Sequence, residues 1–254
     1  MTLKLDSAQT AFFARQLEYV KAKTYDIRYP TLKARDFAPV SGEVNPGATS
    51  VTYRQYDEHG RAKIISNNAK DIPRVDINGQ EFQRPVREVG AAYGWTIKEI
   101  RAAAMAGLDL ETRKAAACRK AIETTLDEVA SVGSPDNGIA TGLLNDANVP
   151  VDTLGAGNDW PTLVAGSDFD AIIDQISAAY GRILAATEGI WRPNTILLPE
   201  DRYALLATTR YGVNADHTLL GFVQNNFKDI TRIEPWYRLT TAGAGGIHRM
   251  MMYD

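Results

Sequence analysis

Residues 95–100 read Trp-Thr-Ile-Lys-Glu-Ile and mark the start of the longest helical region that the sequence predicts. Thr96 is followed three residues later by Glu99. This spacing forms a capping box, in which each side chain accepts a hydrogen bond from the other residue's backbone N–H. Trp95 and Ile100 flank the box at the spacing of a hydrophobic staple. The stretch therefore predicts a helix that begins directly after Thr96.

Helical composition continues from this start to Val132, where Gly133 can supply a left-handed C-cap. Gly107 and Asp109 interrupt the pattern and can divide the region into two helices. We expect Cys118 to serve as a small buried hydrophobic residue in this region. It belongs to one narrow apolar stripe, which consists of Cys118, Ile122, Leu126 and Val129.

The stretch before this helix predicts a β-hairpin. Residues 50–65 alternate between two faces, and residues 57–60 have the composition of a turn. A polar, turn-rich stretch over 66–81 precedes a second extended run over 82–93. Neither face of the first strands is clearly apolar, and such a hairpin is marginal alone. We therefore expect it to project and to pair with something else.

The N-terminal stretch predicts a short amphipathic helix over 7–23, followed by an extended arm over 24–49 in which three prolines block regular helix. Residues 1–35 hold seven basic and three acidic groups, a net charge of +4, against −7 for the rest of the chain. Such an arm can lie against phosphate or an acidic neighbouring subunit, and the alternative is a solvated helix face. The basic candidates are Arg15, Lys21, Lys23, Arg28, Lys33 and Arg35.

The second half of the chain predicts a compact α/β unit. An irregular connection over 134–166 precedes a helix that Ser167 caps, with Asp170 at its third position. The apolar positions of this helix form a broad face, as expected of a core helix. A short buried strand over 194–198 follows.

The remaining elements complete this unit. Pro199 opens a helix to about Thr208, and another helix is expected over 216–227. Strands are expected over 229–239 and 247–253. The strand over 247–253 ends in an apolar run that is typical of the middle of a sheet. One edge of the sheet would therefore remain for another element to cover.

Composition excludes several classes of protein. The 254 residues are 44% hydrophobic and 23% charged, which suits a chain with a real core. One cysteine and three histidines cannot form a disulfide or a Cys/His zinc cluster. No long apolar run and no signal-peptide layout are present, so we expect a cytosolic product without a membrane anchor. The net charge of −3 argues against a general nucleic-acid binder.

The sequence offers no convincing catalytic site. The glycine-rich stretches 155–157 and 243–246 lack the spacing of a phosphate-binding loop, and no Gly-x-Ser-x-Gly elbow occurs. Asp127 is followed by another carboxylate, but adjacent helix positions do not face each other. We therefore expect no enzyme activity, no cofactor and no metal. Core packing is the simpler explanation of the aromatic residues Trp191, Trp236 and Tyr237.

The order of these parts resembles that of the Hong Kong 97-type major capsid proteins of tailed bacteriophages. A basic arm, a projecting hairpin, a capped long helix, a Gly-Leu-Leu-Asn connection and a compact α/β unit follow one another over nearly the whole chain. The stretches that carry the resemblance are 34–47 for the arm, 52–87 for the loop, 95–132 for the spine helix, 142–145 for the connection, and 193–206 with 233–236 for the axial domain.

The resemblance implies an α+β fold of the Hong Kong 97 type, with an N-terminal arm, an extended loop, a long spine helix, a peripheral domain and an α/β axial domain. The division that it implies is 1–49 for the N-terminal helix and arm, 50–93 for the extended β-hairpin loop, 94–145 for the spine helix and peripheral domain, 146–240 for the axial domain, and 241–254 for a strand that returns towards the peripheral domain.

The resemblance also implies a function. It indicates a major capsid protein that self-assembles as pentamers and hexamers into an icosahedral head shell around double-stranded DNA. The further partners implied are a portal protein, a scaffold protein and a decoration protein, together with non-specific contact to the packaged DNA. The resemblance implies no membrane partner, and it implies assembly in the host cytoplasm and a final location in the virion. The alternatives are an encapsulin-like bacterial nanocompartment shell and, less favoured, an unrecognised small-molecule enzyme.

Within this resemblance, charged residues of the loop are expected to pair with adjacent subunits, and the basic arm to lie on the inner surface near DNA or an acidic neighbour. Some relatives join a loop lysine to a neighbour's asparagine covalently, but no position here matches the acidic catalyst. The loop candidates are Arg54, Arg61, Lys63, Asp71 and Arg74.

Overall fold

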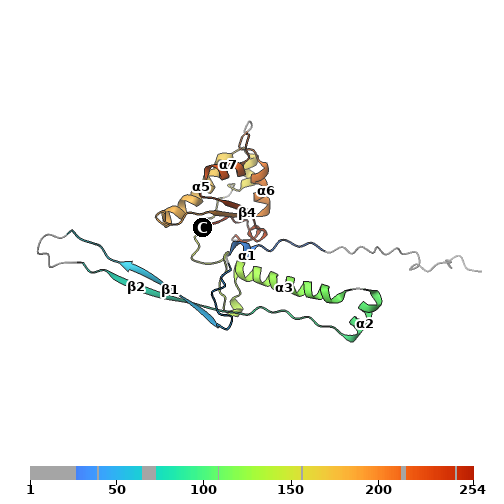
Figure 1. Ribbon diagram of the computed structural model, residues 1–254. Helices are drawn as coiled ribbons and strands as arrows, with labels where there is room; N and C mark the ends of the chain where they lie inside the picture. Colours follow the sequence, from blue (N-terminus) through green and yellow to red (C-terminus); the bar gives the residue numbers. More distant parts are fainter. Residues whose placement is uncertain are drawn as a thin grey trace, which may run out of the picture. The chain divides into compact units, whose positions relative to one another are not determined.

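The computed structural model combines helices with two small β-sheets (Figure 1). The chain divides into two compact units, Met1–Thr31 and Leu32–Asp254, and almost all described structure belongs to the second. The helix predicted over 7–23 lies outside the described residues. The structure describes residues 27–38, 40–64, 73–107, 109–155, 157–212, 216–243 and 245–254.

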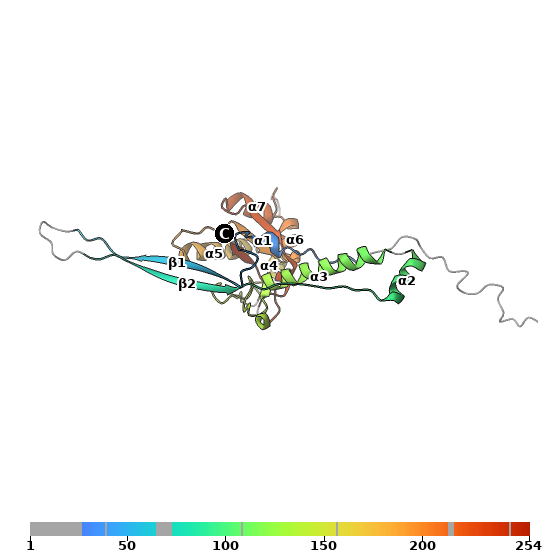
Figure 2. The ribbon, with the colours of Figure 1, turned by 60° about the horizontal axis from the view of Figure 1, so that its bottom comes forward.

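The predicted hairpin is present, but its strands differ from the prediction. Strands β1 (Ser50–His59) and β2 (Asp76–Pro85) form an antiparallel pair, and they run side by side in Figures 1 and 2. The turn predicted over 57–60 is wrong, because residues 57–59 continue β1 and pair with 76–78. Ten cross-strand pairs outweigh the local turn composition of this stretch. The second strand correspondingly begins at Asp76 rather than near residue 82.

The long helical region is divided in two, at the position where the sequence left a break open. Helix α2 (Ile97–Ala106) starts at the expected capping box: the Thr96 N–H donates to Glu99 at 2.9 Å, and the Glu99 N–H donates to Thr96 Oγ1 at 3.2 Å. Gly107 ends α2 in the left-handed conformation, with φ of 63°. Asp109 then caps α3 (Leu110–Val132) by accepting a hydrogen bond from the Thr112 N–H. Both helices are separate in Figure 2.

The apolar stripe of α3 is only half-buried, which corrects the prediction for Cys118. The thiol of Cys118 lies 3.1 Å from the carbonyl oxygen of Ala91 and contacts this preceding segment rather than the core. The two buried residues of α3 are instead polar, Asp127 and Ser131. The buried contacts of α3 are therefore made by polar groups near its C-terminal end.

The connection 142–145 is packed against the C-terminal end of α3. The side-chain amide of Asn145 donates to the carbonyl of Val132 at 2.8 Å, and Leu144 is buried. A Cβ atom on Gly142 would lie 2.5 Å from the Val132 backbone nitrogen, so only glycine fits this approach. A 3₁₀ helix, η2 (Pro135–Asn137), lies between α3 and this connection.

Two helices follow, and only one of them was predicted. Helix α4 (Trp160–Ala165) falls inside the stretch expected to be irregular. Helix α5 (Phe169–Ala186) is the predicted core helix, although its cap is Asp168 and not Ser167. Ser167 has a positive φ of 59° and belongs to the turn between the two helices.

The C-terminal sheet has the order β4-β3-β5. Strand β3 (Thr195–Leu198) pairs parallel with β4 (Arg232–Pro235) and antiparallel with β5 (Met251–Tyr253). The last strand is therefore an edge strand, which corrects its predicted place in the middle of the sheet. Strand β4 is shorter than predicted, because the 3₁₀ helix η3 (Tyr237–Thr240) follows it directly.

Apolar side chains of this half form a first buried cluster beside the sheet. Helices α6 (Glu200–Thr208) and α7 (Leu219–Asn226) contribute to it together with α5. The members with the least exposure include Ile172, Ile176, Ile196, Leu198, Leu206 and Leu219.

A second buried cluster joins distant parts of the chain, and it includes a one-turn helix, α1 (Ala34–Phe37), inside the predicted extended arm. The prolines of the arm lie outside these four residues, so they do not block this turn. Strand β5 takes part through Met251. The buried members are Ala34, Phe37, Leu144, Leu197, Trp236, Leu239 and Met251.

Candidate functional site

The hairpin carries the charged residues that the sequence singles out for contacts with other subunits. Arg54 on β1 already has a partner on its own chain, because its Nε atom lies 2.7 Å from Glu81 Oε1 on β2. Both side chains remain more than half exposed, at 65% and 60%. The pair therefore presents both charges to any second molecule that covers this face.

The remaining loop candidates lie beyond the paired strands. Arg61, Lys63 and Arg74 are exposed, and they follow β1 or precede β2. Asp71 lies outside the described residues. The described basic groups thus lie both after β1 and before β2, and they do not converge on one site.

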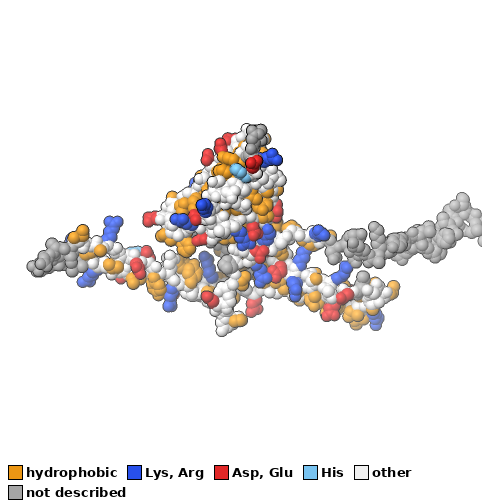
Figure 3. Space-filling model, turned by 45° about the horizontal axis from the view of Figure 1, so that its top comes forward, with side chains coloured by type: hydrophobic (Ala, Val, Ile, Leu, Met, Phe, Trp, Pro, Cys, Tyr) orange, Lys and Arg blue, Asp and Glu red, His pale blue; other side chains and the backbone are white. Residues whose placement is uncertain are grey.

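Both faces of the hairpin carry aromatic or aliphatic side chains that the charge-based analysis missed. Tyr53 and Phe82 stack across the strands with ring centroids 5.0 Å apart. On the opposite face, Tyr56 and Ile77 are 66% and 59% exposed. Figure 3 shows hydrophobic and charged side chains mixed along this hairpin. The two tyrosines of β1, Tyr53 and Tyr56, were the available signal, because their odd spacing places one on each face of a strand.

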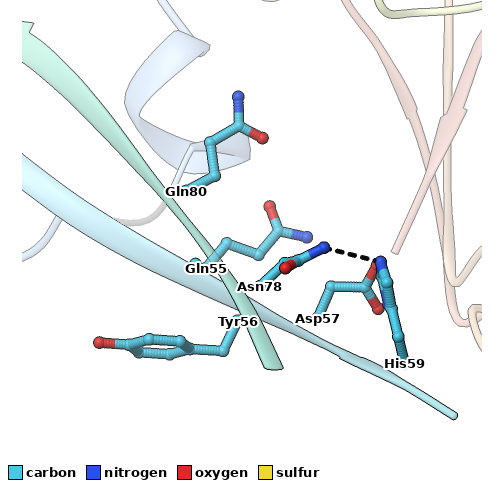
Figure 4. Close-up of a pocket in the computed structure, with 7 residues that line it drawn as sticks. Gln55, Tyr56, Asp57, His59, Asn78 and Gln80 are labelled. Atoms are coloured by element: carbon cyan, nitrogen blue, oxygen red, sulfur yellow. Dashed lines mark hydrogen bonds and ion pairs between the residues drawn. The ribbon is translucent and has the colours of Figure 1, made fainter. Parts of the chain in front are cut away.

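A shallow polar hollow of about 440 Å³ lies on the distal part of the hairpin (Figure 4). The side-chain amide of Asn78 lies 2.9 Å from His59 Nε2, and His59 Nδ1 lies 3.3 Å from Asp57 Oδ2. Gln55 and Gln80 line the same hollow. These groups can exchange hydrogen bonds with a polar partner, but they include no nucleophile beside a base. The hollow therefore suits contact rather than catalysis.

Two of the described basic residues of the arm have partners on their own chain. The Lys33 ammonium group donates to the carbonyl of Pro235 at 3.0 Å, and Arg35 donates to Glu123 at 2.9 Å. Both cations therefore bind acceptors of their own chain, whereas Arg28 is exposed. Arg15, Lys21 and Lys23 lie outside the described residues.

Helix α2 exposes an apolar face that no buried residue anchors. Ile97, Ile100 and Met105 are 70%, 54% and 93% exposed. Trp95 is half exposed as well and meets Tyr93 edge-on at 5.4 Å. The helix is connected to α3 by polar contacts, since Lys114 donates to the carbonyl of Gly94 and pairs with Glu99. Exposed apolar groups on a helix are typical of surfaces that other molecules cover.

The predicted aromatic core is only partly confirmed. Trp236 is buried and packs edge-on against Phe37 at 5.3 Å, and Tyr237 is half-buried. Trp191, in contrast, is 60% exposed beside the exposed Ile190. No three His, Cys, Asp or Glu side chains within the described ranges converge as metal ligands do. None of the helices that the structure describes combines the length and apolar character needed to cross a bilayer.

Comparisons with known proteins agree with this arrangement. The family model described as "Major capsid protein" matches residues 60–254. A solved structure, the capsid of Myoviridae phage XM1, is similar with a TM-score of 0.77 and 19% identity over 94% of this chain and 80% of that chain. A search of curated proteins finds no match. The structural likeness shows a capsid fold of the α+β type.

The family model covers the second strand of the hairpin, both helices after it and the whole C-terminal unit, which is well over half of the chain. This match favours a shell subunit over the two alternatives that the sequence left open. The chain is a structural protein of a capsid shell, and it belongs to the major capsid protein family.

Proposed function

We propose that copies of this chain assemble, as pentamers and hexamers, into the icosahedral head shell of a tailed bacteriophage that encloses double-stranded DNA. The observation that carries the proposal is the hairpin β1–β2. Its strands pair over ten residues, yet no described residue between 50 and 93 is buried. A two-stranded ribbon with both faces exposed is marginally stable alone, so a neighbouring copy is the surface that would cover it.

The resemblance to the family suggests a role for each segment of the chain. Residues 50–93 reach to a neighbouring subunit, 94–145 form the spine helix and peripheral domain, and 146–240 form the axial domain. Residues 241–254 end in β5, which pairs with β3 and also contributes Met251 to the cluster that contains Leu144. The segment 1–49 supplies the arm.

We propose that the charged residues of the loop determine how neighbouring subunits align with each other. Arg54, Arg61 and Arg74 are exposed cations on a surface that also offers exposed carboxylates. Opposite charges facing each other across an interface favour one alignment and disfavour others, although each exposed pair contributes little affinity. Lys63 and Asp71 complete this proposed set.

The remaining partners are part of the same proposal. A portal and a scaffold protein, and a decoration protein on the outside, would join the shell during its assembly in the host cytoplasm. The basic groups up to Arg28 would meet DNA phosphates without sequence preference, since phosphate contacts carry no sequence information. Lys33 and Arg35 also belong to the proposed basic set, and each already has a partner on its own chain.

The test compares the full chain with a variant that lacks residues 52–81. Size-exclusion chromatography and negative-stain electron microscopy should show closed particles for the full chain and none for the variant. Hydrogen exchange in β3 and α5 should match between the two, because neither element draws a core residue from the hairpin. Intact shells from the variant would contradict the role of the hairpin. A full chain that stays a 27.9 kDa monomer with candidate scaffold would contradict the function.

A further inference from the structure

A short stretch of the arm is buried between two exposed stretches. Residues 27–31 and 40–47 are exposed, whereas Ala34 and Phe37 between them are only 3% and 5% exposed. The sequence gives no sign of this, because the stretch has a single large apolar residue. Contacts with distant parts of the chain must therefore hold it in place.

The centre of these contacts is the carboxylate of Asp127, on helix α3, which is 2% exposed. It accepts a hydrogen bond from the backbone N–H of Ala34 at 3.0 Å. It also accepts one from the Tyr237 hydroxyl at 3.3 Å and pairs with the Arg238 guanidinium. Burial raises the pKa of the Tyr237 hydroxyl, so this group stays a proton donor. Three separate stretches of the chain thus meet at one buried charge.

A buried carboxylate is tolerated only when its oxygens are hydrogen-bonded and its charge is paired. Arg238 and Tyr237 occupy one oxygen, and the amide of Ala34 occupies the other. The backbone N–H of Ala34 in the arm therefore supplies a hydrogen bond that the buried carboxylate of Asp127 requires. If the arm left, one carboxylate oxygen would lose its partner.

Further contacts tie the same turn to strands β4 and β5. Arg232 on β4 donates to the carbonyl of Asp36 at 3.1 Å, and its guanidinium lies 5.3 Å from the Phe37 ring centroid. The Tyr253 hydroxyl on β5 donates to the carbonyl of Phe37 at 3.3 Å. Lys33 donates to the carbonyl of Pro235. The turn is thus bound to α3 on one side and to the sheet on the other.

We propose that residues 33–37 form a clamp that couples helix α3 to the β4–η3 segment, with Asp127 as its positioning residue. The clamp operates within a single subunit, before any neighbour binds. It holds the backbone of residues 33–37 in place against α3 on one side and the sheet on the other. This inference does not depend on the proposed function, since it concerns the isolated subunit.

Amide hydrogen exchange of the full-length, unassembled subunit tests the clamp. In the wild type, the peptide that covers residues 33–38 should be protected, because four of its amides are hydrogen-bonded. Asp127→Asn keeps the size of the side chain but removes its charge from Arg238. We expect exchange in this peptide to rise roughly tenfold or more, since hydrogen bonds to charged groups are among the stronger ones.

A second variant releases the clamp without touching the buried pair. Ala34→Pro removes the donor N–H, and proline also disfavours the α conformation that Lys33 adopts before it. The same peptide should lose protection while β3 and α5 exchange as in the wild type. The matched control is Glu123→Gln, which removes only the exposed partner of Arg35 and should leave exchange unchanged.

Two results would overturn the inference. One is a wild-type peptide 33–38 that exchanges as fast as the exposed stretch 40–47. The other is unchanged protection of that peptide in both Asp127→Asn and Ala34→Pro. Neither result bears on whether the chain forms shells, so a failure of the clamp and a failure of the proposed function are distinguishable.

Discussion

Gly142 is the residue at which the path of the backbone is most constrained. Its missing side chain lets the connection 142–145 approach α3, and a Cβ atom there would lie 2.5 Å from two backbone atoms of Ser131 and Val132. Backbone atoms cannot move aside as a flexible side chain can. Glycine is therefore required here by close approach, not by a positive φ.

Gly142→Ala should accordingly lower the free energy of unfolding by about 1–3 kcal/mol or more, the usual range for overpacking. Urea denaturation followed by circular dichroism measures it. The matched control is Gly181→Ala in helix α5, where no atom beyond the neighbouring residues and the helix's own backbone lies within 4 Å of the new Cβ. This control should be neutral or stabilising by about 0.5–1 kcal/mol. Equal effects of the two substitutions would contradict the steric argument.

Glu234 on β4 should make the fold sensitive to acid. Its pKa is held below the ordinary value, first because Arg232 donates a hydrogen bond at 2.7 Å and further because the Lys33 ammonium lies 3.6 Å away. A carboxyl whose pKa is lower in the folded state stabilises the fold above its unfolded-state pKa, near about 4.3, and loses that stabilisation as the pH falls.

Glu234→Gln should therefore lower the free energy of unfolding at pH 7 by about 0.5–1 kcal/mol, since the group is one-third exposed and partly screened. The difference from the wild type should shrink as the pH falls through 4. Urea denaturation at pH 7, 5 and 3.5 measures the trend. A difference that stays constant across this range would show that the carboxylate charge is not responsible.

Among the elements, helix α2 depends most on its own local signals. It has no buried residue, so packing cannot compensate for a lost cap. Thr96→Ala should destabilise this helix by about 1 kcal/mol and raise amide exchange within it, while α3 and the sheet stay unchanged. Thr124→Ala, which removes a hydroxyl that donates to a backbone carbonyl inside α3, is the control. Unchanged exchange in α2 after Thr96→Ala would mean that another contact holds it.

The hairpin offers an element-scale test of whether its charges act within the chain or between chains. Arg54→Glu breaks the cross-strand pair with Glu81, and the double variant Arg54→Glu with Glu81→Arg restores that pair with opposite polarity. If a neighbour's charge faces Arg54, both variants should assemble poorly. Electron microscopy and light scattering of the assembled fraction measure this. Normal assembly of the double variant alone would indicate that the pair serves only its own hairpin.

In the whole molecule, burial is concentrated away from the segments proposed to reach other subunits. The two apolar clusters draw on α1, α4–α7, the connection 142–145 and the sheet, while no residue of α2 and no described residue between 50 and 93 is buried. A subunit built in this way folds around its C-terminal half. Its exposed hairpin then remains available to pack against a surface of another molecule.

The sequence by itself determined the elements whose signals lie within a few residues. The capping box at Thr96, the break at Gly107, the core helix α5 and the buried strand β3 could all be predicted, because capping and periodicity are local properties. The existence of the hairpin was predictable for the same reason. Its register was not, because cross-strand pairing extended β1 through a stretch with turn composition.

Only the tertiary structure decided the role of Asp127, the helical turn at 34–37, the edge position of β5 and the exposure of Trp191. Asp127 is a helix residue beside another carboxylate, and nothing near it in the sequence indicates burial. Its partners lie 93 and 111 residues away. Polar groups become buried only where distant segments bring matching donors to them, and that depends on the packing of the folded chain.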